Sequence, residues 1–178
     1  MARRTRRLFR GGRIIDVGGG HGMLAQAMLL LDGTSSAAVV VDPSIPPSAA
    51  KLHHAIVETW PRLAGLVEFV TGGVDNFAVT AKDVVVSSHA CGRLSDVVLE
   101  RASACGARVA VLPCCHDLDA CDAGGLEGWV DGAMAVDIVR ATRLREKGYR
   151  VWTLAIPRAI TPKNRLLLGA PSTPRTCL

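Results

Sequence analysis

The chain has 178 residues, of which 49% are hydrophobic and 21% charged, and its formal net charge at pH 7 is +5. This length suits one globular domain with its own core, and its apolar runs are shorter than the roughly 20 residues that a membrane-spanning helix needs. The positive charge permits a nucleic-acid partner, although an aromatic content of 4% argues against a base-stacking surface.

The first ten residues, MARRTRRLFR, are rich in arginine. Because GGRIIDVGGGHG follows them in place of an apolar segment, we do not expect a secretion signal. We predict a flexible basic tail over residues 1–12 and a cytoplasmic protein without a membrane partner. The six cysteines are expected to be reduced thiols, since disulfide frameworks belong mainly to secreted chains.

Apolar runs alternate with segments of helical periodicity along the rest of the chain. Strands are expected at RIIDV, AAVVVD, VEFVTG, KDVVVSS and ARVAVLP, and helices at 23–31, 48–63 with a break at Pro61, 94–103 and 131–148. Two more strands, YRVWTLAI and NRLLLGA, follow with only PRAITPK between them. This order predicts an α/β fold with a doubly wound, mostly parallel sheet and a C-terminal antiparallel hairpin. We expect a single domain over residues 13–170 and a tail at 171–178.

A loop with four glycines, DVGGGHG at residues 16–22, follows the first expected strand. Ligands of such sheets bind beyond the carboxyl ends of the strands, and glycines let backbone N–H groups approach a ligand at a helix N-terminus. A dinucleotide loop of the GxGxxG type needs a small residue where Met23 stands. An NAD-type oxidoreductase is therefore the weaker interpretation.

The spacing of Gly18, Gly20 and Gly22 after Asp16 resembles the first motif of S-adenosylmethionine-dependent methyltransferases. The resemblance implies that this loop lies near the methionine end of S-adenosylmethionine and that Asp42 holds the ribose hydroxyls, where a carboxylate can accept two hydrogen bonds. It also suggests Asp75 as the adenine partner. The alternative is that Asp16 and Asp42 only cap turns. The residues expected to bind the cofactor are Asp16, Gly18, Gly19, Gly20, Gly22, Asp42, Pro43, Val74, Asp75, Ser88 and His89.

Three later segments, HACG (89–92), LPCC (112–115) and TPKN (161–164), occur together in this chain. The combination resembles a methyltransferase subgroup that includes a eukaryotic tRNA ribose methyltransferase, and the resemblance covers residues 13 to about 169. It implies a Rossmann-like methyltransferase domain with tRNA or rRNA as its substrate. The alternatives are a small-molecule methyltransferase and a non-catalytic module that binds RNA or protein. A homodimer is also compatible with the sequence.

Polar residues follow the fourth and fifth expected strands, at the edge where methyl transfer would occur. Such a transfer is an in-line displacement, so the protein aligns the nucleophile and, where required, removes its proton. His89 and then His116 are the candidate bases, because histidine titrates near neutral pH. Cys114 or Cys115 is a candidate covalent nucleophile, although buried thiols at strand ends are commoner. The residues expected to contact the substrate are Cys91, Asp137, Arg140, Lys163 and Asn164.

The same part of the sequence contains soft ligands for zinc. The candidate ligands are His89, Cys91, Cys114, Cys115, His116 and Cys121. Their spacing lacks the C-x-x-C pairs that are typical of zinc sites, so we expect no metal.

Overall fold

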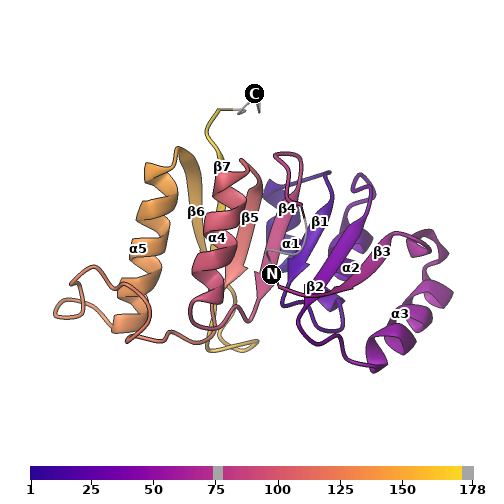
Figure 1. The fold of residues 1–178 in the computed structure, drawn as a ribbon, viewed down its shortest axis with the longest axis horizontal. Helices are drawn as coiled ribbons and strands as arrows, with labels where there is room; N and C mark the ends of the chain where they lie inside the picture. Colours follow the sequence, from indigo (N-terminus) through magenta and orange to yellow (C-terminus); the bar gives the residue numbers. More distant parts are fainter. Residues whose placement is uncertain (74–77, 174–178) are drawn as a thin grey trace.

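The computed structural model of the chain describes residues 1–73 and 78–173. Within these residues, seven strands form one sheet in the order β3-β2-β1-β4-β5-β7-β6 (Figure 1). The strands are β1 (Ile14–Val17), β2 (Ala38–Asp42), β3 (Val67–Thr71), β4 (Val84–Ser88), β5 (Arg108–Leu112), β6 (Tyr149–Ala155) and β7 (Arg165–Pro171). The strands β1 to β5 pair in parallel, whereas β7 runs antiparallel to β5 and β6. The predicted mostly parallel sheet with an antiparallel hairpin is confirmed.

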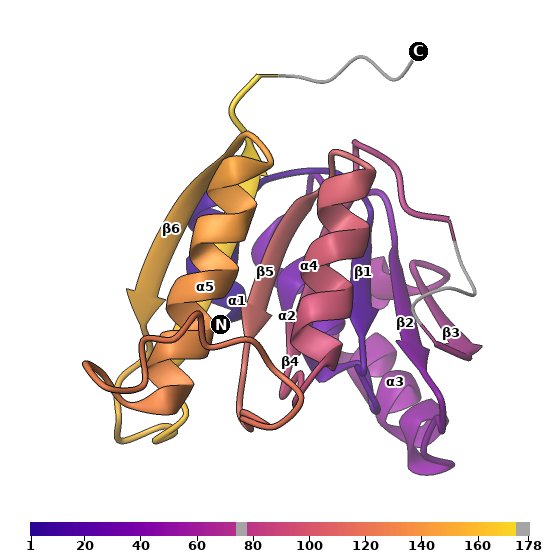
Figure 2. The same ribbon diagram turned by 60° about the vertical axis from the view of Figure 1, so that its left-hand side comes forward.

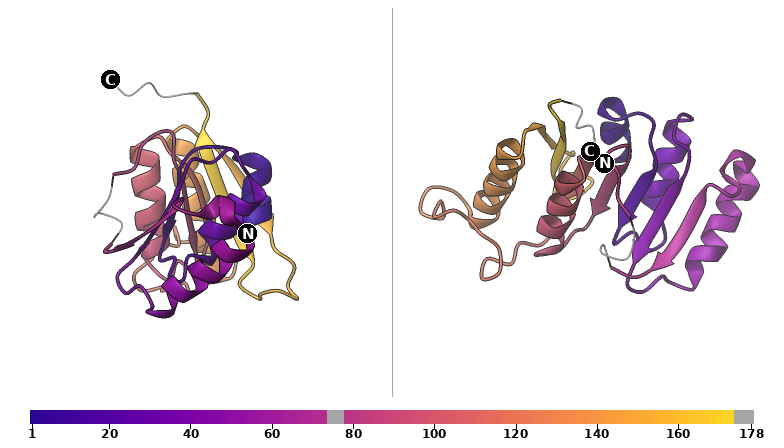
Figure 3. Two further views of the ribbon diagram at one scale, coloured as in Figure 1. Left: turned by 90° about the vertical axis from the view of Figure 1, so that its right-hand side faces the viewer. Right: turned by 45° about the horizontal axis from the view of Figure 1, so that its top comes forward.

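Helices cover both faces of this sheet (Figure 2). They are α1 (Ala2–Leu8), α2 (Met23–Leu31), α3 (Ser48–Thr59), the 3-10 helix η1 (Pro61–Leu63), α4 (Leu94–Ala104) and α5 (Gly132–Glu146). Viewed along the sheet, α4 lies on one side and α1 on the other (Figure 3). In the part of the chain that the structure describes, no helix is both long and apolar enough to cross a membrane.

Two apolar cores lie on the two faces because neighbouring strand residues point in opposite directions. Ile15 and Val85 pack in the core that includes Val98 of α4, whereas Ile14 and Val84 pack in the core that includes residues of α2. Because both faces are covered, the central strands are mainly apolar, which explains why short hydrophobic runs identified them.

The amino terminus differs from the flexible tail expected from its arginines. Residues 2–8 form α1, and the buried Arg6 donates to the carbonyl oxygens of Met28 and Phe9 at 3.2 and 3.1 Å. Its guanidinium also lies 3.4 Å from Asp32 and donates to Ser35. A buried cation is tolerated when acceptors surround it, and these contacts hold α1 against α2.

The expected domain boundary at residue 170 does not match the end of the last strand. Pro171 is still part of β7, where it pairs with Tyr149, and the Ser172 N–H donates to the Gly148 carbonyl oxygen.

The carboxyl ends of β1, β2, β4 and β5 lie along one edge of the sheet, together with the loop between β6 and β7. This edge is at the bottom of Figures 1 and 2, opposite the C-terminus. The fold therefore brings the glycine loop, HACG, LPCC and TPKN segments to the same side of the molecule.

A candidate active site at the carboxyl edge of the sheet

The glycine loop connects β1 to α2 and is held against β2. The Gly18 N–H donates to the Val41 carbonyl oxygen at 2.8 Å, and the Gly20 N–H donates to Oδ2 of Asp42 at 3.0 Å. A Cβ at Gly19 would lie only 2.8 Å from Cγ of Asp16, so the backbone passes close to this carboxyl group. Gly20 has a φ of +50° and faces open space. The loop therefore has a packed side and an open side.

Asp16 lies beneath the loop and is fully buried. Its Oδ2 accepts a hydrogen bond from the Ala25 N–H at 3.1 Å, at the start of α2. Its Oδ1 is buried and has no hydrogen-bond partner among the described residues. Burial, opposed by the hydrogen bond from Ala25 and assisted by the nearby charge of Asp42, raises the pKa of this carboxyl group to about 7. A buried acceptor without a partner is costly, so a donor or cation bound at the loop would stabilise it.

Asp42 ends β2 and holds the neighbouring turns. Its Oδ2 accepts from Gly20, and its Oδ1 accepts from the Ser44 N–H at 2.9 Å. Asp42 therefore does cap turns, as the alternative interpretation expected. An ionised carboxylate offers about four acceptor positions, so this half-buried group keeps acceptor capacity for a diol.

The other residues expected to bind the cofactor occupy different positions along this edge. Pro43 is exposed next to Asp42, and Ser88 is half-buried at the end of β4. Val74 and Asp75 lie outside the described residues, so the adenine contact stays a prediction. His21 was not predicted; its Nε2 lies 2.7 Å from Oγ of Ser48, which links the loop to α3. Its position inside the glycine motif was the only sequence signal.

The loops after β4 and β5 run side by side next to the glycine loop. The His89 N–H donates to the Leu112 carbonyl oxygen at 3.2 Å, and the Gly92 N–H donates to that of Cys115 at 2.9 Å. His89 is exposed and has a φ of +62°, a conformation that non-glycine residues adopt rarely and often at functional sites. The structure thus places the first candidate base at the sheet edge.

Three of the six cysteines come together here. Sγ of Cys114 lies 2.9 Å from Sγ of Cys91 and 3.7 Å from Sγ of Cys115. Burial, together with hydrogen bonds to the two neighbouring thiols, raises the pKa of Cys114 to about 12. A thiol with such a pKa is a poor nucleophile at neutral pH, which disfavours the predicted covalent role for Cys114 in the structure described.

His116 belongs to a buried network that Arg140 also joins, through Asp137. Its side chain is 3% exposed, and its Nε2 lies 2.8 Å from Oδ1 of Asp137 on α5. Oδ2 of Asp137 accepts from Nε of Arg165 on β7 at 2.7 Å. Although burial opposes it, hydrogen bonds from His116 and Arg165 lower the pKa of Asp137. His116 and Asp137 therefore connect the loop after β5 with α5 and β7, and Arg165 is a member that the sequence analysis missed.

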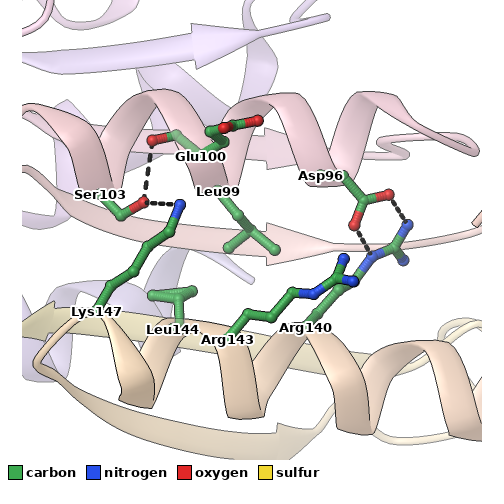
Figure 4. Close-up of a pocket in the computed structure, with 8 residues that line it drawn as sticks. All are labelled: Asp96, Leu99, Glu100, Ser103, Arg140, Arg143, Leu144 and Lys147. Carbon is green, nitrogen blue, oxygen red and sulfur yellow. Dashed lines mark hydrogen bonds and ion pairs between the residues drawn. The ribbon is translucent and has the colours of Figure 1, made fainter. Parts of the chain in front are cut away.

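Arg140 was expected to contact the substrate, but its side chain is only 1% exposed. It donates two hydrogen bonds to Asp96 of α4, at 2.8 and 2.7 Å, and another to the Gly92 carbonyl oxygen at 3.0 Å. Figure 4 shows this ion pair at one end of a pocket of about 260 Å³ between α4 and α5. Arg140 thus positions the loop after β4 from the interior. Asp96, its partner, was not predicted, because the sequence gives no sign that α4 and α5 are adjacent.

The loop between β6 and β7 contains the last two predicted residues. Lys163 is exposed at the sheet edge, whereas Nδ2 of Asn164 donates to the Ile156 carbonyl oxygen at 2.7 Å and closes the hairpin. Two apolar side chains of α5, Met134 and Ile138, are 38% and 40% exposed. They line a groove of about 540 Å³ between α5, β6 and β7 that also reaches Asp137.

Solved methyltransferases share this fold. An O-methyltransferase family protein from Burkholderia thailandensis matches with a TM-score of 0.59 and 21% identity, over 92% of this chain and 52% of that chain. The O-methyltransferase NcsB1 of neocarzinostatin biosynthesis, in complex with S-adenosylmethionine and 2-hydroxy-5-methyl naphthoic acid, gives 0.56 and 23%, over 90% and 49%. The B. subtilis M1A22 tRNA methyltransferase TrmK gives 0.59 and 16%, over 97% and 65%. The chain thus spans about half the length of the first two proteins.

No curated protein sequence matches the chain. A family profile described as a methyltransferase domain matches residues 5–120. This match includes the glycine loop, Asp42 and the HACG and LPCC segments. Together with the fold and the geometry of the glycine loop, it shows that the chain belongs to this family of methyltransferase domains.

Proposed function

We propose that the chain is an S-adenosylmethionine-dependent methyltransferase that binds its methyl donor between the glycine loop and Asp42. The observation that carries this proposal is the buried Oδ1 of Asp16, which lacks a hydrogen-bond partner among the described residues. A ligand with a positively charged sulfonium and ammonium group complements the two carboxyl groups at this loop. Family membership supports the same cofactor.

The residues of the chain then have distinct tasks. Asp42 offers its remaining acceptor positions to the ribose hydroxyls, and the backbone at Gly20 leaves space for the ligand. His89, exposed on the adjacent loop, accepts a proton from the nucleophile where one must be removed. The bound donor supplies an electrophilic methyl group, so alignment of the nucleophile is the main contribution of the protein.

Calorimetry with S-adenosylhomocysteine tests the cofactor, with NAD as the competing ligand. We expect binding of the former only. Asp42→Ala should weaken binding about tenfold to a hundredfold, because hydrogen bonds to a charged group are lost. Ser44→Ala is the matched control, since its contact to Asp42 is made by the backbone. Binding of NAD alone, or unchanged affinity in Asp42→Ala, would contradict the assignment.

For the substrate we propose RNA, either tRNA or rRNA. Exposed basic side chains at the sheet edge, Arg93, Arg158 and Lys163, can neutralise phosphates. Lys163→Ala should weaken tRNA binding and reduce the slope of log affinity against log salt by about 1. Filter binding at several salt concentrations measures this slope. Affinity that does not respond to salt would exclude the RNA proposal.

A small apolar molecule is the second candidate substrate. The groove beside Met134 and Ile138 favours it, as do the exposed acidic residues Asp117 and Asp119 in the loop after β5, which repel phosphates. Incubation with a radiolabelled methyl donor and fractionated cell extract separates the candidates. Label in the RNA fraction supports the first proposal, and label only in the metabolite fraction supports the second.

A further inference from the structure

We propose that Cys91, Cys114 and Cys115 together bind a zinc ion at the carboxyl edge of the sheet. Among the described residues, their Sγ atoms all lie within 4.8 Å of one another. Zinc–thiolate bonds of about 2.3 Å in a tetrahedral site place ligand sulfurs about 3.8 Å apart. The 3.7 Å between the sulfurs of Cys114 and Cys115 matches this value, whereas the 2.9 Å between Cys114 and Cys91 is shorter and has to widen by about 0.9 Å when the ion binds. Small side-chain rotations would complete the site.

The backbone holds these thiols together before any ion binds. The loops that contain them are joined by the hydrogen bond from Gly92 to Cys115, and Arg140 donates to the Gly92 carbonyl oxygen from the interior. Adjacent residues of a strand point to opposite faces. Cys114 and Cys115 lie beyond the end of β5 at Leu112, so they do not alternate between faces in this way. Their sulfurs lie 3.7 Å apart. Ligand positions that the fold already holds cost little entropy on binding.

The three cysteine sulfurs determine which metal ion the site prefers. Three thiolates favour zinc over magnesium or calcium, which prefer oxygen ligands. No further histidine, cysteine or carboxylate joins the cluster within the described ranges, and Cys91 and Cys115 are exposed. Three protein ligands with an open fourth position are typical of catalytic zinc. The open position would accept water or a substrate atom.

The proposal reverses the expectation from the sequence, which rested on the missing C-x-x-C spacing. That spacing is typical of ligands on one turn, whereas here 23 residues separate Cys91 from Cys114. The zinc site does not depend on the proposed methyl donor, because none of its ligands belongs to the glycine loop or to Asp42.

Elemental analysis of the full-length, untagged protein, purified without chelators, tests the site. We expect about one zinc ion per chain, as three thiolates suffice to retain it. Cys91→Ser and Cys114→Ser should lose the zinc. Cys105→Ser, at the C-terminal end of α4 and outside the cluster, should retain it. Zinc loss from Cys105→Ser as well would overturn the assignment to these three cysteines.

Titration of the reduced, metal-free wild-type protein with Co²⁺ is a second measurement that does not depend on how the variants fold. We expect a thiolate-to-cobalt charge-transfer band in the near ultraviolet, and we expect Cys115→Ser, which leaves only two thiolates, to lose it as the other two variants lose zinc. A wild-type protein that holds no zinc and develops no band, or a Cys91–Cys114 disulfide after anaerobic purification, would overturn the proposal. Calorimetry with S-adenosylhomocysteine on the same samples reports on the methyl donor separately.

Discussion

Gly19 occupies a position in the glycine loop where a side chain would not fit. A Cβ there would lie 2.8 Å from both Cγ of Asp16 and Cγ1 of Val40, whereas a Cβ at Gly33 would meet nothing within 4 Å. We expect Gly19→Ala to lower the free energy of unfolding by about 1–3 kcal/mol through overpacking and to weaken S-adenosylhomocysteine binding. Gly33→Ala is the control. Urea unfolding and calorimetry measure both effects, and equal behaviour of the two variants would contradict the steric argument.

At the scale of elements, the buried side chain of Arg6 connects α1 to α2 and to Asp32. Replacing it with Met leaves Asp32 buried without its cation, and breaking a buried pair in this way costs about 3–5 kcal/mol. We expect urea unfolding to show a loss of this size for Arg6→Met. Arg7→Ala, an exposed change on the same helix, should stay within about 0.5 kcal/mol of the wild type. A flexible tail over residues 1–12 would instead make both variants neutral.

For the whole molecule, two buried carboxyl groups give stability opposite dependences on pH. Burial raises the pKa of Asp16 to about 7, so the protonated group stabilises the fold below about pH 4 and this contribution is lost as the pH rises through 7. Burial of Asp32 is outweighed by hydrogen bonds from Thr34 and Gly11, which lower its pKa to about 2. Its contribution is present above about pH 4 and is lost as the pH falls towards 2.

The two contributions together predict a stability maximum near pH 4 to 5 in the ligand-free protein. Chemical denaturation between pH 3 and 8 measures it. Asp16→Asn should remove the decline between about pH 4 and 7, and Asp32→Asn should remove the decline on the acid side. A wild-type profile that rises steadily to pH 7, unchanged in Asp16→Asn, would contradict the assignment.

Much of the fold was predictable because short-range patterns determine it. The strands and helices from β1 onwards lie close to their predicted ranges, since buried strands are mainly apolar and helices repeat every 3.6 residues. The break at Pro61 was also correct, as α3 ends at Thr59 and η1 follows. The helix α1 was missed because five arginines in ten residues resemble a solvated segment, and only Asp32 and the carbonyls around it make Arg6 a buried residue.

By itself, the sequence determined the order of the elements, the family and the glycine loop with Asp16 and Asp42, because these depend on neighbouring residues. Tertiary structure alone decided that Arg140 is interior, that His116 pairs with Asp137 and Arg165, and that Cys91 meets Cys114 and Cys115. These contacts join residues 21 to 44 positions apart. Local sequence propensity does not specify which loops and helices pack together. These pairs therefore form only when the sheet brings the carboxyl ends of its strands to one edge.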